Sequence, residues 1–226
     1  MKLKLNSKLQ RHARNFCIST IATFALVLGG KSAGNFLLAR SSPNVQIAIA
    51  ATRNLPGLQI KDDASDGPLE AEIVTGPWQQ FSSDDLGFEV EFPPGDLSQE
   101  RQVFDTHMGD LSVRTFSVDS GSRAYTVFYT AFPDYLAVIP VETTIESAID
   151  GVLANVRRRT EPDRVLEMNG YPGHEMHYEG RDGLLYQHQI FVVDRHIFQV
   201  VAAAGDREDS FADDSERFFS SFEFLY

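Results

Sequence analysis

The sequence predicts an α+β protein in which an antiparallel β-sheet is flanked by helices. Three observations predict this fold class: short runs with an apolar residue at every second position, turn residues between these runs, and two segments with apolar residues at helical spacing. Strands that follow one another through short turns pair antiparallel, so a meander is expected.

The 226-residue chain divides into three parts. Residues 1–34 carry basic residues, then an apolar run, then small residues, which is the pattern of an export signal. The apolar run is shorter than the roughly twenty residues that cross a bilayer, which favours a cleaved signal peptide over a permanent membrane anchor. Residues 35–76 mix Pro, Gly, Ser, Asn and Asp without periodicity and are predicted to be a flexible linker. Residues 77–226 are long enough to form one domain around one core.

The predicted domain and linker are strongly acidic. Beyond residue 40 the chain has 13 Lys or Arg residues and all 32 of its Asp and Glu residues. Binding of phosphate backbones depends on Lys and Arg, so this charge argues against nucleic acid as a partner. Cys17 is the only cysteine and lies in the predicted signal. A processed chain would therefore have no disulfide, cysteine nucleophile or thiolate metal site.

Strands are predicted on both sides of a central helix. Apolar and acidic residues alternate over 88–92, and Pro93-Pro94-Gly95 ends that run. Two further strands are expected around the turn residues Ser120-Gly121-Ser122. After the helix, three more strands are predicted over 164–180, 183–194 and 196–204.

Two helices are predicted. Apolar residues at helical spacing indicate the first over 141–160, with Thr143 and Glu146 as a capping box at its start. Arg157–Arg159 would lie in its last turn, where the helix dipole stabilises cations. Residues 209–224 predict a second helix with an acidic start, followed by a short final strand.

The strongest candidate site is a hairpin over residues 170–190, which holds three of the six histidines. Both Arg181-Asp182 and Asp182-Gly183 are good two-residue turns. Either turn places five polar side chains on one face of the hairpin, namely Glu175, His177, Glu179, Tyr186 and His188. The second turn also places His177 directly opposite His188, close enough to share an ion.

Two interpretations of this hairpin stay open. Imidazoles on adjacent strands with a nearby carboxylate can bind zinc, which makes Glu175, His177 and His188 candidate metal ligands. The preferred interpretation is a polar strand surface with no cofactor, because His174 and His177 point to opposite faces of a strand and cannot act as a pair. The sequence contains no H-E-x-x-H motif, and no catalytic residue is predicted.

Short stretches spread over residues 77–226 carry a family resemblance. They are Trp78 followed by "GFEVEFP", then "YTVFYTAFP", "TTIESAIDGVLANV", "NGYPGHE", "RHIFQVVAA" and "RFFSSFEF". In these stretches the chain resembles the PsbP/Mog1-like domain family, which includes PsbP, an extrinsic photosystem II protein, and many exported bacterial proteins. The shared stretches are structural in character. They imply a turn at Gly173, core positions at Phe88 and Phe92, and a last helix sealed by Phe218 and Phe222.

The resemblance implies an α/β/α sandwich with a non-catalytic role in the periplasm or the thylakoid lumen, in some members associated with calcium or other metals. The chain differs from plant PsbP in being poor in lysine, with only Lys61 beyond residue 40. The main hypothesis is an exported accessory or assembly protein that binds a protein or membrane-complex partner, photosystem II among the candidates. The alternative is a metal-binding protein or metal-dependent enzyme centred on residues 174–188. A retained N-terminal segment would tether the domain to a membrane.

Overall fold

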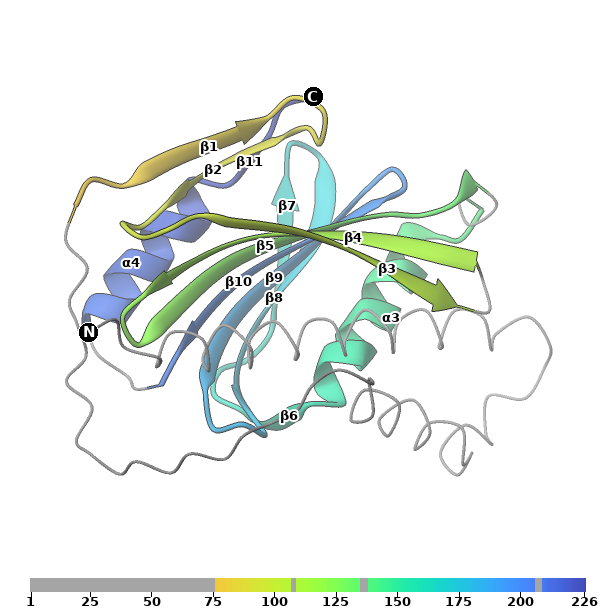
Figure 1. Ribbon diagram of the computed structural model, residues 1–226. Helices are drawn as coiled ribbons and strands as arrows, with labels where there is room; N and C mark the ends of the chain where they lie inside the picture. The colour runs from red at the N-terminus through yellow and green to blue at the C-terminus, as the bar shows by residue number, and fades with distance from the viewer. Residues whose placement is uncertain (1–75, 107–108, 135–137, 206–208) are drawn as a thin grey trace, which may run out of the picture.

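A computed structural model describes residues 76–106, 109–134, 138–205 and 209–226 (Figure 1). The predicted signal peptide or anchor at 1–34 and the linker up to residue 75 lie outside these ranges. Within them, none of the helices has the length and apolar character needed to span a bilayer.

An eight-stranded antiparallel sheet forms the centre of the domain (Figure 1). The strand order is β3-β4-β5-β10-β9-β8-β6, and β7 also pairs with β8. The strands are β3 (Ser98–Thr106), β4 (Gly109–Ser120), β5 (Arg123–Ala131), β6 (Val156–Arg159), β7 (Arg164–Met168), β8 (Tyr171–Gly180), β9 (Leu185–Val193) and β10 (His196–Ala204). All pairings in the sheet are antiparallel, which confirms the predicted sheet type.

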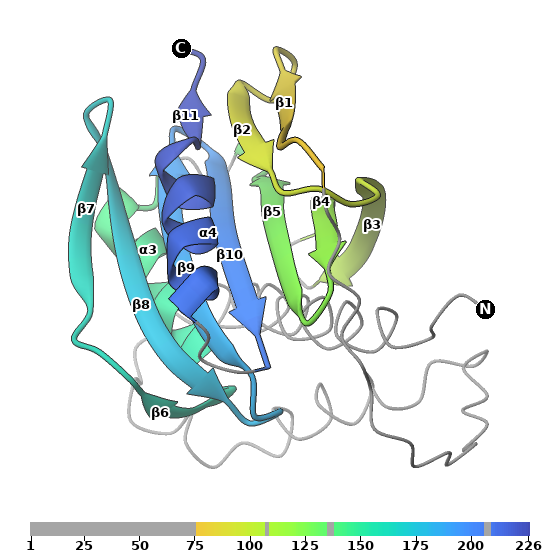
Figure 2. The same ribbon diagram turned by 90° about the vertical axis from the view of Figure 1, so that its left-hand side faces the viewer.

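Two helices flank this sheet on opposite faces (Figure 2). Helix α3 (Val141–Leu153) buries Ile145 and Val152 in one apolar cluster with Ile190 of the sheet. Helix α4 (Asp209–Ser220) buries Phe218 in a second cluster on the other face. The predicted α+β class, an antiparallel sheet flanked by helices, is therefore confirmed.

A small second sheet lies on the α4 side of the domain (Figure 2). It consists of β1 (Gln79–Ser83), β2 (Phe88–Phe92) and β11 (Glu223–Phe224), in the order β1-β2-β11. The predicted core positions are confirmed: Phe88, Phe92, Phe218 and Phe222 are all at most 1% exposed. Their rings pack against one another, as in the 5.7 Å contact between the centroids of Phe88 and Phe222.

The predicted first helix ends earlier than expected. Helix α3 stops at Leu153, and Arg157–Arg159 lie in the edge strand β6 instead of a last helical turn. No side-chain cap bonds its first turn, so the predicted capping box of Thr143 and Glu146 is wrong. Pairing of β6 with β8 gives residues 156–159 backbone hydrogen bonds that helical spacing alone does not reveal. Charged residues on this short edge strand also disfavour pairing with another chain.

The predicted strand over 164–180 is in fact two strands. Asn169 and Gly170 have φ angles of 54° and 83°, the left-handed conformation required at both central residues of a type I′ turn. This turn folds β7 back onto β8, with Met168 opposite Tyr171. The edge strand β3 was not predicted, because its polar side chains do not alternate with apolar ones.

Gly173 lies within β8 and not in the predicted turn. A Cβ atom at this position would lie 2.4 Å from Cδ1 of Phe191 and 3.0 Å from the carbonyl oxygen of Ile190. The glycine therefore lets the Phe191 ring of β9 pack directly on the backbone of β8.

We expect Gly173→Ala to lower the free energy of unfolding by about 1–3 kcal/mol, because the added methyl group overpacks the contact with Phe191. Gly205→Ala is the matched control, since a Cβ at Gly205 meets no atom within 4 Å. Urea unfolding of both variants and the parent measures the difference. Equal stability of the two variants would contradict the close packing at Gly173.

Candidate functional site

The turn between β8 and β9 determines which side chains meet. The amide of Gly180 donates to the carbonyl of Leu184 at 2.9 Å, which leaves three residues, 181–183, in the loop. Gly183 has a φ of 84°, as expected for the left-handed residue of a three-residue hairpin loop. The Asp182 carboxylate accepts hydrogen bonds from the amide of Leu184 at 3.1 Å and from the hydroxyl of Tyr186 at 2.6 Å.

This loop length corrects the predicted face of His188. Both turns considered from sequence have two residues, whereas the observed loop has three. The register therefore pairs His177 with Gln187 and His188 with Met176. A shift of one residue moves a whole strand's side chains to the other face. The predicted convergence of His177 and His188 is wrong: they lie on opposite faces of the sheet.

His188 is a fully buried core residue on the α3 face. Its Nδ1 lies 3.0 Å from the Tyr178 hydroxyl, and its Nε2 lies 3.1 Å from Oε1 of Gln199. A neutral ring satisfies both contacts, with Nε2 donating to Gln199 and Nδ1 accepting from Tyr178. Burial lowers the pKa of His188 to about 3, against a smaller opposite effect of the Gln199 hydrogen bond. Both ring nitrogens are thus occupied inside the core.

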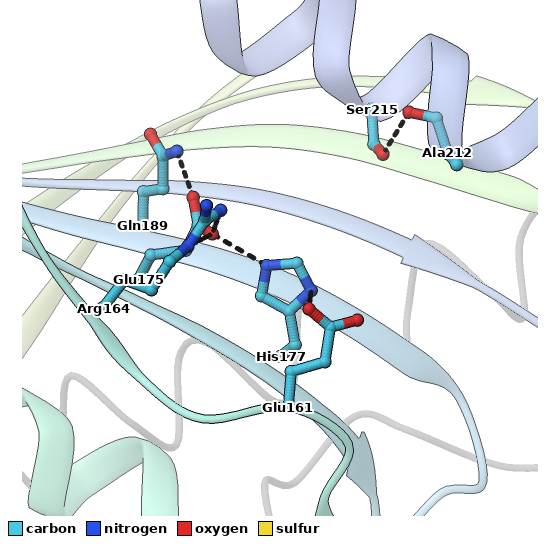
Figure 3. Close-up of polar contacts among 7 residues, drawn as sticks. All are labelled: Glu161, Arg164, Glu175, His177, Gln189, Ala212 and Ser215. Atoms are coloured by element: carbon cyan, nitrogen blue, oxygen red, sulfur yellow. Dashed lines mark hydrogen bonds and ion pairs between the residues drawn. The ribbon is translucent and has the colours of Figure 1, made fainter.

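A second polar group, the Glu175 network, lies on the α4 face (Figure 3). Its centre is the Glu175 carboxylate, of which only 2% is exposed. Oε1 accepts hydrogen bonds from Nε of Arg164 at 2.9 Å, from Nη2 of the same residue and from Nε2 of His177 at 2.8 Å. Oε2 accepts from the amide of Gln189 at 2.6 Å. Neighbouring strands supply all four residues: β7, β8 and β9.

Hydrogen bonding keeps Glu175 ionised although it is buried. Burial by itself raises the pKa of this carboxyl, but hydrogen bonds from His177, Arg164 and Gln189, together with the positive charge of Arg164, outweigh it. The net result is a pKa of about 2. Glu175 is therefore an anion whose charge is stabilised within the domain.

Two carboxylates of the connection between β6 and β7, Glu161 and Asp163, contact histidines of β8. Glu161 approaches Nδ1 of His177 at 3.5 Å (Figure 3), and Asp163 lies 3.1 Å from Nε2 of His174. Asp163 also pairs with Arg159 at 2.9 Å. These contacts hold the connection against the sheet. His177 thereby lies between the carboxylates of Glu161 and Glu175.

The arrangement is closed rather than open to a substrate or ion. Both Glu175 oxygens and both His177 nitrogens already contact protein groups. Ser215 of α4, also shown in Figure 3, is buried but donates its hydroxyl to the carbonyl of Ala212 at 3.0 Å. Among the described residues, no three or more His, Cys, Asp or Glu side chains are placed to hold one metal ion.

The structure thus brings together two of the three predicted metal ligands, Glu175 and His177, and separates His188 from them. Sequence reasoning missed Arg164 and Gln189 as members of the network. Gln189 follows from the correct register, which places it directly opposite Glu175. Arg164 follows from recognising the Asn169-Gly170 turn, because that turn also places Arg164 opposite Glu175.

Glu175→Gln is expected to lower the free energy of unfolding by about 2–4 kcal/mol, because it removes a buried anion while the Arg164 cation that donates to it remains. Glu161→Gln is the matched control in the same network. It should cost less than about 1 kcal/mol, since the Glu161 side chain is 53% exposed. Denaturant unfolding at pH 7 checks both values, and a larger loss in the control would refute the central role of Glu175.

The stabilisation from Glu175 should disappear in acid. Its pKa is lower in the folded state than in the unfolded chain, so the stabilisation is present in full above about pH 4.5. It is lost as the pH falls from there towards the folded pKa of about 2. Unfolding curves between pH 7 and 2 should therefore show a smaller acid-induced loss in Glu175→Gln than in the parent. Parallel curves for the two proteins would contradict the assigned ionisation.

Comparisons with known proteins give structural similarities only. No protein-family model matches the chain, and no curated protein matches it in sequence. One similar solved structure is the cyanobacterial PsbP protein CyanoP from Synechocystis sp. PCC 6803, with 15% identity and a TM-score of 0.41, covering 70% of this chain and 99% of that one. Another is PA94 from Pseudomonas aeruginosa, a protein of unknown function, with 9% identity and a TM-score of 0.34, covering 62% and 90%. Neither similarity assigns the chain to a family.

Proposed function

We propose that this chain is an exported, non-catalytic accessory or assembly protein with a PsbP-like domain, and that it binds a protein or membrane-complex partner. The observation that carries the proposal is the saturation of the Glu175 network. Its carboxylate accepts four hydrogen bonds from the domain itself, so its role is to hold β7, β8 and β9 together. Function is then exerted through the surface of the domain.

Export rests on the basic, apolar and small residues of the N-terminal segment. The periplasm and the thylakoid lumen are the two compartments that this proposal admits, and photosystem II is one candidate complex. If the N-terminal segment is retained, the domain acts from the membrane surface.

The partner surface we propose is the outer edge of β7. Among the described strands, β7 pairs with β8 only, so no described strand lies along its other edge. Val165, the second residue of this strand, is 84% exposed. An exposed edge strand with an apolar side chain suits a partner that adds an extended segment to the sheet.

Val165→Lys is expected to reduce partner recovery at least about tenfold, because a charge on the edge strand opposes strand addition. The test captures partners of the full chain from the exported and membrane fractions of the native host, with quantitative mass spectrometry. Val103→Lys is the matched control. Val103 is also exposed, at 56%, but lies on β3 at the opposite edge of the same sheet.

Equal recovery with Val165→Lys and the parent would contradict the β7 surface. Repeated capture without any partner would contradict the proposed role as a whole. Elemental analysis of the same untagged protein decides the alternative function: stoichiometric zinc or calcium would favour a metal protein centred on the 174–188 hairpin.

A further inference from the structure

Arginine residues cluster at one edge of an acidic domain. The described ranges contain 25 Asp or Glu residues and ten Arg residues, and four of these arginines, Arg157–Arg159 and Arg164, lie within eight consecutive positions. Their side chains are 67%, 66%, 44% and 63% exposed, in that order. On a chain with an excess of negative charge, this cluster is a surface that attracts an anionic partner.

The two strands that carry these arginines lie along the same edge of β8 (Figure 2). Strand β6 pairs with residues 178–180 of β8, and β7 pairs with residues 171–175. Between these pairings, the amide of Thr160 donates to the carbonyl of His177 at 2.9 Å. Strands β6 and β7 thus form one interrupted outer edge, which we call the β6–β7 edge. Among the described strands, none pairs with its other side.

The carboxylates that pair with these arginines are far less exposed than the arginines themselves. Glu179 accepts from Nη1 of Arg157 at 2.7 Å and from Nε of Arg158 at 2.6 Å, and its side chain is 12% exposed. Glu175, which pairs with Arg164, is 2% exposed. A guanidinium has five N–H donors, and the contacts with Glu179 engage one nitrogen of each arginine. The edge therefore presents positive charge and hydrogen-bond donors to solvent.

The spacing of the arginines matches the repeat of an extended strand. Arg158 lies opposite Glu179, and Arg164 lies opposite Glu175. These two positions of β8 are four residues apart, which is about 13 Å at the rise of a strand, and they share a face. A segment that extends along the edge has the same repeat. Acidic side chains at its first and fifth positions would therefore lie beside Arg158 and Arg164.

The positions between these two acidic residues face different surroundings. His177 lies midway on the same face, and its Nδ1 is 3.5 Å from the Glu161 carboxylate, which is 53% exposed (Figure 3). A third acidic side chain at this point would be repelled by Glu161. Val165 lies opposite His174, which places it on the other face of the edge. The second and fourth positions of the segment would therefore meet an apolar side chain.

We propose that the β6–β7 edge binds an extended protein segment with two acidic residues four positions apart, an uncharged residue midway and apolar residues between them. This inference rests on the proposed function, because it gives the chemistry of the partner at the β7 surface. Arginine forks suit carboxylates, and strand addition supplies backbone hydrogen bonds. The strand repeat favours a peptide over a membrane surface, since lipid headgroups impose no such spacing.

Fluorescence anisotropy with labelled peptides tests the pattern on the full chain. One peptide has Glu-Val-Thr-Val-Glu at its centre, and the other has Gln-Val-Thr-Val-Gln. At low salt the Glu peptide should bind at least about tenfold more tightly, and the difference should shrink as salt screens the charges. A peptide with Glu also at the middle position should bind about threefold less tightly than the first, because of Glu161.

Two double variants test the arginines. Arg157→Gln with Arg158→Gln should weaken binding of the Glu peptide about fivefold or more. Arg101→Gln with Arg114→Gln is the matched control, since it removes two exposed arginines that lie opposite each other on β3 and β4. The control should stay within about twofold of the parent, because those charges are distant from the edge. Residues 1–40 are identical in all three proteins, so the differences report on the arginines.

Equal binding of the Glu and Gln peptides to the parent would overturn the inference, as would equal weakening in both double variants. Arginine-dependent binding to phosphatidylglycerol vesicles, without a preference between the peptides, would also overturn it and assign the edge to an anionic membrane. These failures are distinct from failure of the proposed function. Loss of the partner in Val165→Lys together with equal peptide binding would retain the β7 surface and reject only its acidic occupant.

Discussion

The pairing register of β8 and β9 is the constraint on which the rest of the site depends. It is set at the turn, where Gly183 takes the left-handed conformation and Asp182 bonds the amide of Leu184. This turn sends His188 into the apolar core beneath α3 and leaves Glu175 and Gln189 together on the α4 face. A two-residue turn would exchange the faces of one whole strand relative to the other, and neither polar network could form.

The His188 group and the Glu175 network offset the free-energy cost of burying polar groups in different ways. His188 avoids the cost of a buried charge by staying neutral between Tyr178 and Gln199. Glu175 keeps its charge, and the donors around it compensate for lost hydration. In both arrangements the ring nitrogens of His188 and the carboxylate oxygens of Glu175 already have partners within the domain. This is the physical reason to seek the function of the domain on its surface.

Much of the fold was predictable because alternation and helical spacing report burial directly. The strand at 88–92 and the turn at 120–122 follow from such patterns and agree with the structure. The end of α3 could not be predicted, since Val156 fits a helical stripe as well as an edge strand. For the site, the patterns identified Glu175 and His177 but not their face relative to His188. Two-residue and three-residue turns at Asp182-Gly183 look alike in sequence, and only the long-range pairing separates them.

The register itself can be measured by cross-strand nuclear Overhauser effects in isotopically labelled protein. The account predicts close backbone contacts between Met176 and His188 and between Tyr178 and Tyr186, which are directly opposite in the antiparallel pair. Contacts that instead pair His177 with His188 would contradict it, because the two imidazoles would then share a face and the Glu175 network would lose Gln189.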